Sequence, residues 1–249
     1  MFQTSDLLST PLRPPEGARR GRLRGVPLEL GFVLVAFVCN ALVRWYTLDD
    51  ESRAVANAHD VLALQEALGL DWEHAVQDAT LAVPWLDHFT QWFYVWGYFP
   101  VLVSVLVGLY VLRPETYRLF RNALLVSGAI GLLGYAFYPT APPRLTDLRY
   151  VDTVATGALD SAARPVGIAN EWGAIPSFHV GWLAVAGYLV YLVTHSALLR
   201  VLCVLVPVLM SYAILATGNH WVLDIPAGLV VALLGLLGAR SLEHRRTAG

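Results

Sequence analysis

The chain contains no lysine, and charged residues account for only 14% of its 249 positions. Soluble globular domains carry about 25% charged residues, so this deficit is not typical of a protein whose surface faces water. Hydrophobic residues make up 56% of the chain. Together, the shortage of charge and the apolar excess indicate that lipid surrounds most of this protein.

Cysteine is also scarce, with Cys39 and Cys203 as the only two. Both fall within apolar stretches, where we expect free thiols that pack as small hydrophobic side chains. All 17 basic residues are arginines. Most of them flank apolar stretches, which is an ordinary arrangement at a membrane surface, so we expect no nucleic-acid partner.

Six apolar stretches are long enough to cross the hydrocarbon core of a bilayer, which takes about 20 helical residues. We therefore predict an all-α polytopic membrane protein, with six transmembrane helices in a bundle and short interfacial helices. The stretches are residues 26–46, 89–112, 122–138, 177–194, 201–217 and 221–239.

Arginine is unevenly distributed across these six predicted spans. With both termini inside, 12 of the 17 arginines fall on the inner side and 5 on the outer side. An excess of arginine marks the cytoplasmic side of membrane proteins. We therefore expect an integral protein of a bacterial cell membrane, with both termini cytoplasmic. Arg144, the start of the 177–194 span and His220 then share the outer face, which places the active site there.

The chain divides into a central membrane domain and two polar ends. Residues 26–240 form the predicted catalytic domain, residues 1–25 a disordered cytoplasmic arm, and residues 241–249 a cytoplasmic tail. Within the domain, we expect outer interfacial helices over residues 54–82. We also expect the outer loop of residues 139–175 to cap the site, because loops of this length are usually functional or disordered.

The predicted interfacial helices carry several polar side chains. Apolar residues at helical spacing predict a helix over residues 54–68 that stops at Gly69. Glu66, Glu73 and Gln77 lie on these amphipathic interfacial helices, where we expect them to face water or the mouth of the site. A solvated outer face is the simpler interpretation of these three residues.

An aromatic cluster marks the beginning of the second predicted span. Such a cluster is typical of the aromatic belt at a membrane interface, and the lining of a lipid entry path is the alternative. The cluster comprises Trp85, Trp92, Tyr94, Trp96 and Tyr98.

Two histidines and one aspartate interrupt the apolar runs, where titratable side chains are costly unless they have a function. His220 and Asp224 are four residues apart, so on a helix the carboxylate lies one turn from the imidazole and can accept its hydrogen. The other ring nitrogen is then free to attack phosphorus. His179 lies at the same predicted depth, and imidazole exchanges protons near neutral pH. The three residues predict a catalytic site for phosphoryl transfer.

The segment before His179 predicts a phosphate cradle at a helix start. Pro176 prevents the helix from extending toward the N-terminus, and Ser177 is a good N-cap. The amides of Phe178, His179 and Val180 are then free at the positive end of the helix dipole. Helix capping alone explains the same pattern, but the neighbouring histidines favour a phosphate site.

Three other interpretations of these residues stay open. His179, His220 and Asp224 can form a buried structural hydrogen-bond network instead of a catalytic one. A zinc site is poorer, because cysteine or additional histidine ligands are missing nearby, and we expect no metal. A serine hydrolase is also poorer, because Ser177 lacks the turn that lifts a serine nucleophile out of a helix.

Residues 173–179 and 219–224 resemble the second and third signature motifs of the type 2 phosphatidic acid phosphatase (PAP2) superfamily. Together with residues 141–144, they look most like the fungal-type inositol phosphorylceramide synthase branch of that superfamily. The likeness covers roughly residues 85–240.

The resemblance implies a six-helix membrane fold and catalysis through a phosphohistidine, without a metal or any other cofactor. On the matching positions it implies that His220 is the nucleophile and Asp224 its partner. It implies that His179 protonates the departing oxygen and then activates water or an acceptor hydroxyl. Ser177 and the backbone amides that begin with Phe178 would hold the phosphoryl oxygens.

The chain departs from the family pattern at its phosphate-binding cations. The usual first motif pairs a lysine with a downstream Arg-Pro, but Gly157 stands seven positions before Arg164. The third motif usually has an arginine six residues before its histidine, where this chain has Ile214. Arg144 is the obvious replacement, with Arg164 as a second candidate.

The small number of cations bears on the substrate. A phosphate monoester is close to a dianion at neutral pH, whereas a phosphodiester carries one charge and needs fewer fixed cations. We therefore expect a phospholipid or other lipid-phosphate donor and a lipid or polyol acceptor. The alternative is a lipid phosphatase that acts on phosphatidic acid or a polyprenyl phosphate with water as acceptor. A lipid-binding or transport protein is more distant, because no inverted repeat supports it.

Overall fold

The structure, a computed structural model, describes residues 16–156 and 170–248. Within these ranges, the regular secondary structure is helical, apart from one isolated parallel bridge between Thr140 and Gly173. The predicted all-α fold class is therefore confirmed for the described residues. Arg164 lies outside them.

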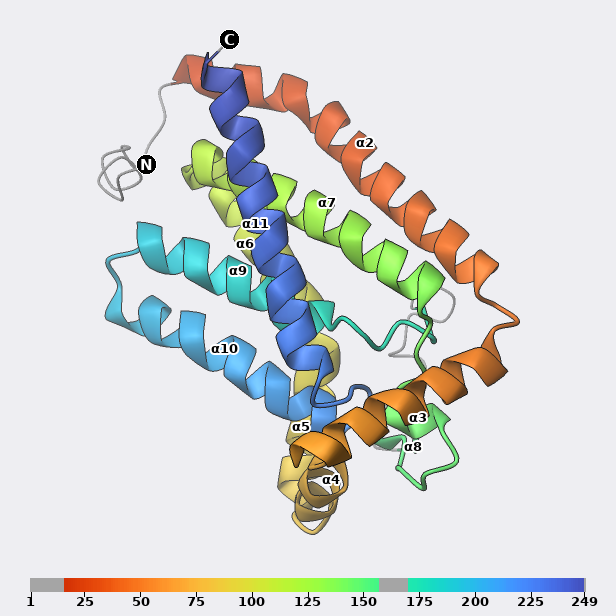
Figure 1. Cartoon of the computed structure of the whole chain (residues 1–249). Coiled ribbons are helices and arrows are strands. Elements are labelled where there is room, and N and C mark those ends of the chain that lie inside the picture. The colour runs from red at the N-terminus through yellow and green to blue at the C-terminus, as the bar shows by residue number, and fades with distance from the viewer. Residues whose placement is uncertain (1–15, 157–169, 249) are drawn as a thin grey trace.

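The helices form an elongated bundle with α3, α4 and α8 at one end, where α10 ends and α11 begins (Figure 1). The helices are α2 (Glu16–Tyr46), α3 (Glu51–Leu68), α4 (Glu73–Leu81), α5 (Pro84–Trp96), α6 (Phe99–Leu112), α7 (Pro114–Phe137), the 3₁₀ turn η1 (Pro143–Leu145), α8 (Thr153–Thr156), α9 (Phe178–Val193), α10 (Ala197–Ala216) and α11 (Asp224–Ala248).

Among the described residues, four helices are long and apolar enough to cross a membrane: α2, α7, α10 and α11. Helices α5 and α6 together qualify as a fifth span, but they are bent by 42° at the break between Trp96 and Phe99. The prediction of one continuous helix over residues 89–112 is therefore wrong. Pro100 in the first turn of α6 explains the break, because proline lacks an N–H and its ring clashes with a preceding helical turn.

Helix α9 is a further apolar helix, and its 16 residues make it shorter than these spans. At 1.5 Å per residue it covers about 24 Å, less than the hydrocarbon core of about 30 Å. A count of six spans includes both the bent α5–α6 pair and α9, and it stays a prediction.

Helix α2 begins earlier than the sequence predicted, whereas helix α3 ends where it was predicted to end. Helix α2 begins at Glu16, within the segment 1–25 for which we predicted disorder. Alanine, arginine and leucine, which favour helix, occupy much of that stretch. Helix α3 ends as predicted at Gly69, which adopts the left-handed conformation with φ of 67°. Glycine takes this conformation without a steric penalty.

Helix α2 packs mainly against α7 (Figure 1). Many of its apolar side chains are exposed. Leu30 and Val33 are 63% and 66% exposed, as expected of side chains that contact lipid. Two polar contacts fix α2 to α7: Glu29 accepts a hydrogen bond from Tyr117 at 2.7 Å and forms an ion pair with Arg121 at 2.6 Å.

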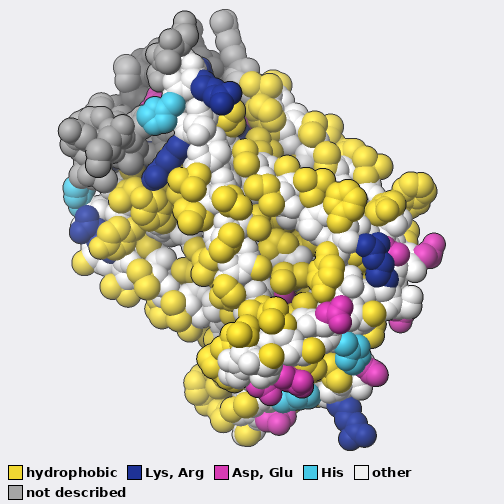
Figure 2. Space-filling model, in the orientation of Figure 1, with side chains coloured by type: hydrophobic (Ala, Val, Ile, Leu, Met, Phe, Trp, Pro, Cys, Tyr) yellow, Lys and Arg dark blue, Asp and Glu magenta, His cyan; other side chains and the backbone are white. Residues whose placement is uncertain are grey.

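The surface is divided between apolar and charged regions. In Figure 2, hydrophobic side chains cover the middle of the molecule, whereas acidic side chains gather at the end formed by α3 and α4. An apolar band between two polar ends is the surface that a bilayer requires. The apolar helices and this surface indicate an integral membrane protein.

Helices α7, α9, α10 and α11 form the centre of the bundle, with α11 against α7 and α9, and α9 against α10. Phe120, Leu189 and Met210 are fully buried in this core. Helices α9 and α11 meet at Gly228, where a Cβ atom would lie 2.1 Å from the carbonyl oxygen of Ser177. Glycine at this position lets the start of α9 lie directly beside the start of α11.

A second, smaller core joins α3 to the loop of residues 139–175. The carbonyl of Ala54 accepts a hydrogen bond from the amide of Ala141 at 3.0 Å, and Trp221 Nε1 donates to the carbonyl of Ala141 at 2.9 Å. Helix α3 therefore covers the end of the bundle at which α11 begins. This core contains Ala54, Ala58, Val61, Ala141, Ala174 and Trp221.

Helices α3 and α4 bury polar side chains against the neighbouring loops. Glu73 and Gln77 are 1% and 2% exposed, so the expectation of a solvated face is wrong for these two residues. Glu66 is exposed, as expected. The difference arises because both helices pack onto the end of the bundle and do not merely lie beside it on the membrane surface.

Candidate active site

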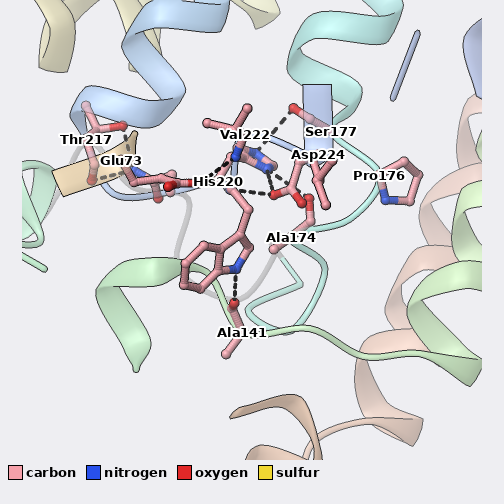
Figure 3. Close-up of polar contacts among 12 residues, drawn as sticks. Glu73, Ala141, Ala174, Pro176, Ser177, Thr217, His220, Val222 and Asp224 are labelled. Carbon is pink, nitrogen blue, oxygen red and sulfur yellow. Dashed lines mark hydrogen bonds and ion pairs between the residues drawn. The ribbon is translucent and has the colours of Figure 1, made fainter. Parts of the chain in front are cut away.

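His220 lies in the turn between α10 and α11, and its ring is fixed from one side. Nδ1 lies 3.0 Å from Oδ2 of Asp224 and 2.8 Å from the carbonyl oxygen of Ala174 (Figure 3). Both neighbours are acceptors, so Nδ1 carries the proton and donates it. Nε2 then has a free lone pair, which is the form that a nucleophilic imidazole requires.

Asp224 is the first residue of α11, and its side chain is completely buried. Its Oδ2 also accepts a hydrogen bond from the amide of Trp221 at 2.8 Å. The predicted spacing of one helical turn therefore has a different origin: His220 precedes α11, and the intervening turn brings its ring onto the carboxylate. The geometry still makes Asp224 the orienting partner of His220.

Ser177 occupies the N-cap position of α9, but its side chain forms no capping hydrogen bond. Its Oγ instead lies 3.5 Å from Nε2 of His220, the nitrogen with the free lone pair (Figure 3). The amide of Ser177 donates to the carbonyl of Asp224 at 3.1 Å, which joins the starts of α9 and α11. The expected capping by the hydroxyl is thus wrong, while the expected position at the helix start is confirmed.

His179 lies in the first turn of α9, across from His220. The centres of the two imidazole rings are 5.4 Å apart. Tyr94 and Tyr98 contact the ring of His179, with centroid distances of 4.9 Å and 4.3 Å. The structure therefore brings His179, His220 and Asp224 together from separate elements, and Ser177 lies with them.

Phe178 is the first residue of α9 and directly follows Ser177. Its side chain stacks on Trp182 at 4.5 Å and meets the edge of Tyr135 at 5.7 Å. Gly131 makes room for it, because a Cβ atom there would lie 2.1 Å from the ring. The ring anchors the start of α9, and its amide is among the first of the helix, which lack intrahelical acceptors.

Arg144 lies beside the His220 turn, at the start of the segment that connects α7 to α9. Its Nε donates to Oδ1 of Asn219 at 2.8 Å, and its Nη1 pairs with Asp152 at 3.2 Å. Its backbone amide donates to the carbonyl of Gly218 at 3.0 Å. Gly218 has a φ of 66°, and a Cβ atom there would lie 3.1 Å from the carbonyl oxygen of Val151. Arg144 is therefore held next to the turn that carries His220, and part of its charge is compensated.

Comparisons with known proteins fit this arrangement. The family model of the PAP2 superfamily matches residues 59–238, which include His179, His220 and Asp224 and make up more than half of the chain. The chain belongs to the PAP2 superfamily. Members of this superfamily are generally phosphatases or phosphotransferases, and the membership implies a lipid phosphate as substrate. No curated protein and no solved structure matches the chain.

Two groups of residues around His179 and His220 lie in surroundings that the sequence did not predict. Tyr94 and Tyr98, which we placed in an aromatic belt, contact His179, whereas Trp92 is 52% exposed. Glu73, which we expected on a solvated face, binds the turn after His220 together with Gln65, for which we made no prediction from the sequence. Nothing in the sequence alone distinguished the tyrosines from their neighbouring tryptophans.

Among the described residues, no group of three or more His, Cys, Asp or Glu side chains has an arrangement suited to a metal ion.

Proposed function

We propose that this protein is a membrane enzyme of the PAP2 superfamily that transfers a phosphoryl or phosphoryl-headgroup unit through a phosphohistidine on His220. The reaction that we favour is an inositol phosphorylceramide synthase-like transfer from a phospholipid to a hydroxyl acceptor. The environment of His220 carries the proposal. Two acceptors hold the proton on Nδ1, and Nε2 faces Ser177 at the start of α9.

The first step forms the phosphohistidine. Nε2 of His220 attacks phosphorus, and the bond from phosphorus to the leaving oxygen breaks, with its electrons on that oxygen. Protonated His179 gives its proton to this oxygen, so the leaving group departs as an alcohol such as diacylglycerol. His220 keeps its Nδ1 proton, and the carboxylate of Asp224 balances the positive charge of the phosphorylated ring.

The second step discharges the phosphohistidine. His179, now neutral, takes a proton from the acceptor hydroxyl, whose oxygen attacks phosphorus. The bond between phosphorus and Nε2 breaks, and the electron pair returns to His220. A lipid or polyol hydroxyl gives a transferase, and water gives a lipid phosphatase. Ser177 and the amides at the start of α9 are the proposed ligands of the phosphoryl oxygens in both steps.

The charge near the nucleophile supports a phosphodiester donor. Arg144 is the cation beside the His220 turn, and Asp152 already compensates part of its charge. A dianionic monoester gains more from several unpaired cations than a diester with one negative charge does. This favours head-group transfer between lipids over removal of a terminal phosphate.

The reaction is tested with purified protein in nanodiscs that contain a phospholipid labelled at its phosphate. We expect the label to pass into a new lipid or phosphorylated polyol when a hydroxyl acceptor is supplied, with release of diacylglycerol. The His220→Ala variant serves as the inactive reference. Label that never enters the supplied acceptor and appears only in inorganic phosphate or in the phosphate ester of the original head group would show transfer to water and contradict the transferase.

A further inference from the structure

Glu73, near the beginning of α4, is a buried carboxyl group that contacts the turn after His220. Its Oε1 accepts a hydrogen bond from the amide of Val222 at 2.7 Å and another from Nε2 of Gln65 at 2.7 Å (Figure 3). Gln65 is also completely buried, and its Oε1 accepts from the amide of Leu223 at 2.9 Å. Two side chains from α3 and α4 thus bind two consecutive amides of the turn.

These amides occupy a particular place in the chain. Val222 and Leu223 lie between His220 and Asp224, immediately before the first residue of α11. Amides at a helix start have no acceptor within the helix, so other groups must satisfy them when they are buried. Glu73 and Gln65 supply these acceptors, and in doing so they fix the backbone that joins the two residues.

We propose that Glu73 and Gln65 are positioning residues for the PAP2 reaction, which hold His220 in register with Asp224 and aim its Nε2 at Ser177. This inference rests on the proposed function of His220. The two residues act through the backbone and touch neither the phosphoryl group nor the reacting nitrogen. Loss of their acceptors would release the turn and weaken the contact of 3.0 Å between His220 and Asp224.

The contacts of Glu73 indicate which property of the side chain matters. One oxygen, Oε1, accepts both hydrogen bonds, while the buried Oε2 has no partner among the described residues. Burial raises the pKa of the Glu73 carboxyl above its ordinary value. The acceptor oxygen, and not the negative charge, is therefore the required feature. Glutamine keeps such an oxygen in the same place, and leucine does not.

The experiment compares Glu73→Gln with Glu73→Leu in full-length protein reconstituted in nanodiscs, with Glu66→Leu as the matched control. Glu66 lies on α3 and is exposed. A nucleophile displaced by about 1 Å loses roughly 100-fold in rate. We therefore expect Glu73→Leu to slow phosphohistidine formation by about that factor with KM changed less than about threefold. Glu73→Gln and Glu66→Leu should stay close to the parent.

A second readout does not depend on turnover. In protein labelled with ¹⁵N-histidine, the Nδ1–H signal that His220→Ala removes should persist in Glu73→Gln and be lost or split in Glu73→Leu. Gln65→Met, which lacks both hydrogen-bonding atoms, should behave like Glu73→Leu and replaces it if that variant does not fold. An unchanged rate and spectrum in these variants, or equal losses in Glu73→Gln and Glu73→Leu, would overturn the inference.

The two readouts separate this inference from the proposed function. Absence of phosphohistidine in the parent protein would contradict the role of His220 as nucleophile. The histidine spectrum would still show whether Glu73 and Gln65 set the tautomer and position of that ring. Conversely, a phosphohistidine that forms at the parent rate in Glu73→Leu would leave the proposed function intact and remove the positioning role.

Discussion

Nδ1 of His220 and Oδ2 of Asp224 lie 3.0 Å apart, and the two side chains are 5% and 0% exposed. Asp224→Asn should therefore leave the fold intact but lower kcat by roughly 10³-fold or more, because the amide no longer fixes the Nδ1 tautomer or balances the imidazolium. His220→Ala should abolish labelling altogether. Rapid-quench kinetics with alkaline trapping of the labelled protein measures both. Equal rates in Asp224→Asn and the exposed control His195→Ala would contradict this role.

His179→Ala should slow departure of the leaving group far more than it weakens substrate binding. The expected loss is about 10²-fold to 10⁴-fold in kcat with little change in KM, as for removal of a general acid. A substrate with an activated leaving group, such as a nitrophenyl ester, needs no protonation and should recover most of the rate. A variant that is equally impaired with both substrates would argue against proton transfer by His179.

Arg144→Ala should raise KM and lower kcat together, because the guanidinium is proposed to contact the phosphoryl group before and during transfer. The control is Arg164→Ala, which removes the second candidate cation. Steady-state kinetics at constant ionic strength compares the two variants. If Arg164→Ala alone reproduces the loss, the phosphate cation is Arg164 and our assignment is wrong.

Asp152→Asn should shift the substrate preference toward phosphomonoesters. Asp152 pairs with Nη1 of Arg144 at 3.2 Å, so its neutralisation leaves more positive charge available to a dianionic phosphate. The quantity to measure is the ratio of kcat/KM for a lipid monoester to that for a lipid diester. The expected change is several-fold, and a ratio equal to that of the parent would show that the pair does not select the charge of the substrate.

Chelators should leave activity intact, because the proposed steps use only His179, His220, Asp224 and a phosphate cradle. The measurement is the rate of transfer after extended treatment with EDTA and with a zinc-selective chelator, each with a no-chelator control. Strong inhibition that added zinc reverses would contradict the metal-independent steps.

The candidate catalytic residues were accessible from the sequence because their chemistry is local. A histidine four residues before an aspartate, and a serine before a helix, stand out in an apolar chain, and the structure brings them together. The spacing of Gln65 also indicates a buried position, because it follows Val61 by four residues and Ala58 by seven, on the buried face of α3. This spacing alone does not show which groups the side chain binds.

Other features depend on tertiary contacts that no local pattern reveals. Glu73 in the first turn of α4 is an ordinary residue for a helix start, and only the packing of α4 onto the His220 turn gives it a buried partner. The bend between Trp96 and Phe99 has a local cause in Pro100, but it falls within an apolar run that hydropathy alone treats as one span. Hydropathy indicates whether a segment lies in lipid or in water. It gives no information on where the helix axis changes direction.

The pairing of Thr140 with the segment around Gly173 has a consequence for protein engineering. The amide of Thr140 donates to the carbonyl of Trp172 at 2.7 Å, and its carbonyl accepts from the amide of Ala174 at 3.2 Å. These hydrogen bonds join the two ends of the segment between α7 and α9. Ala174, whose carbonyl oxygen contacts Nδ1 of His220, lies at one of these ends. Exchange of residues between these two ends that leaves Thr140 and Trp172 to Ala174 unchanged should therefore keep the carbonyl of Ala174 in place against His220.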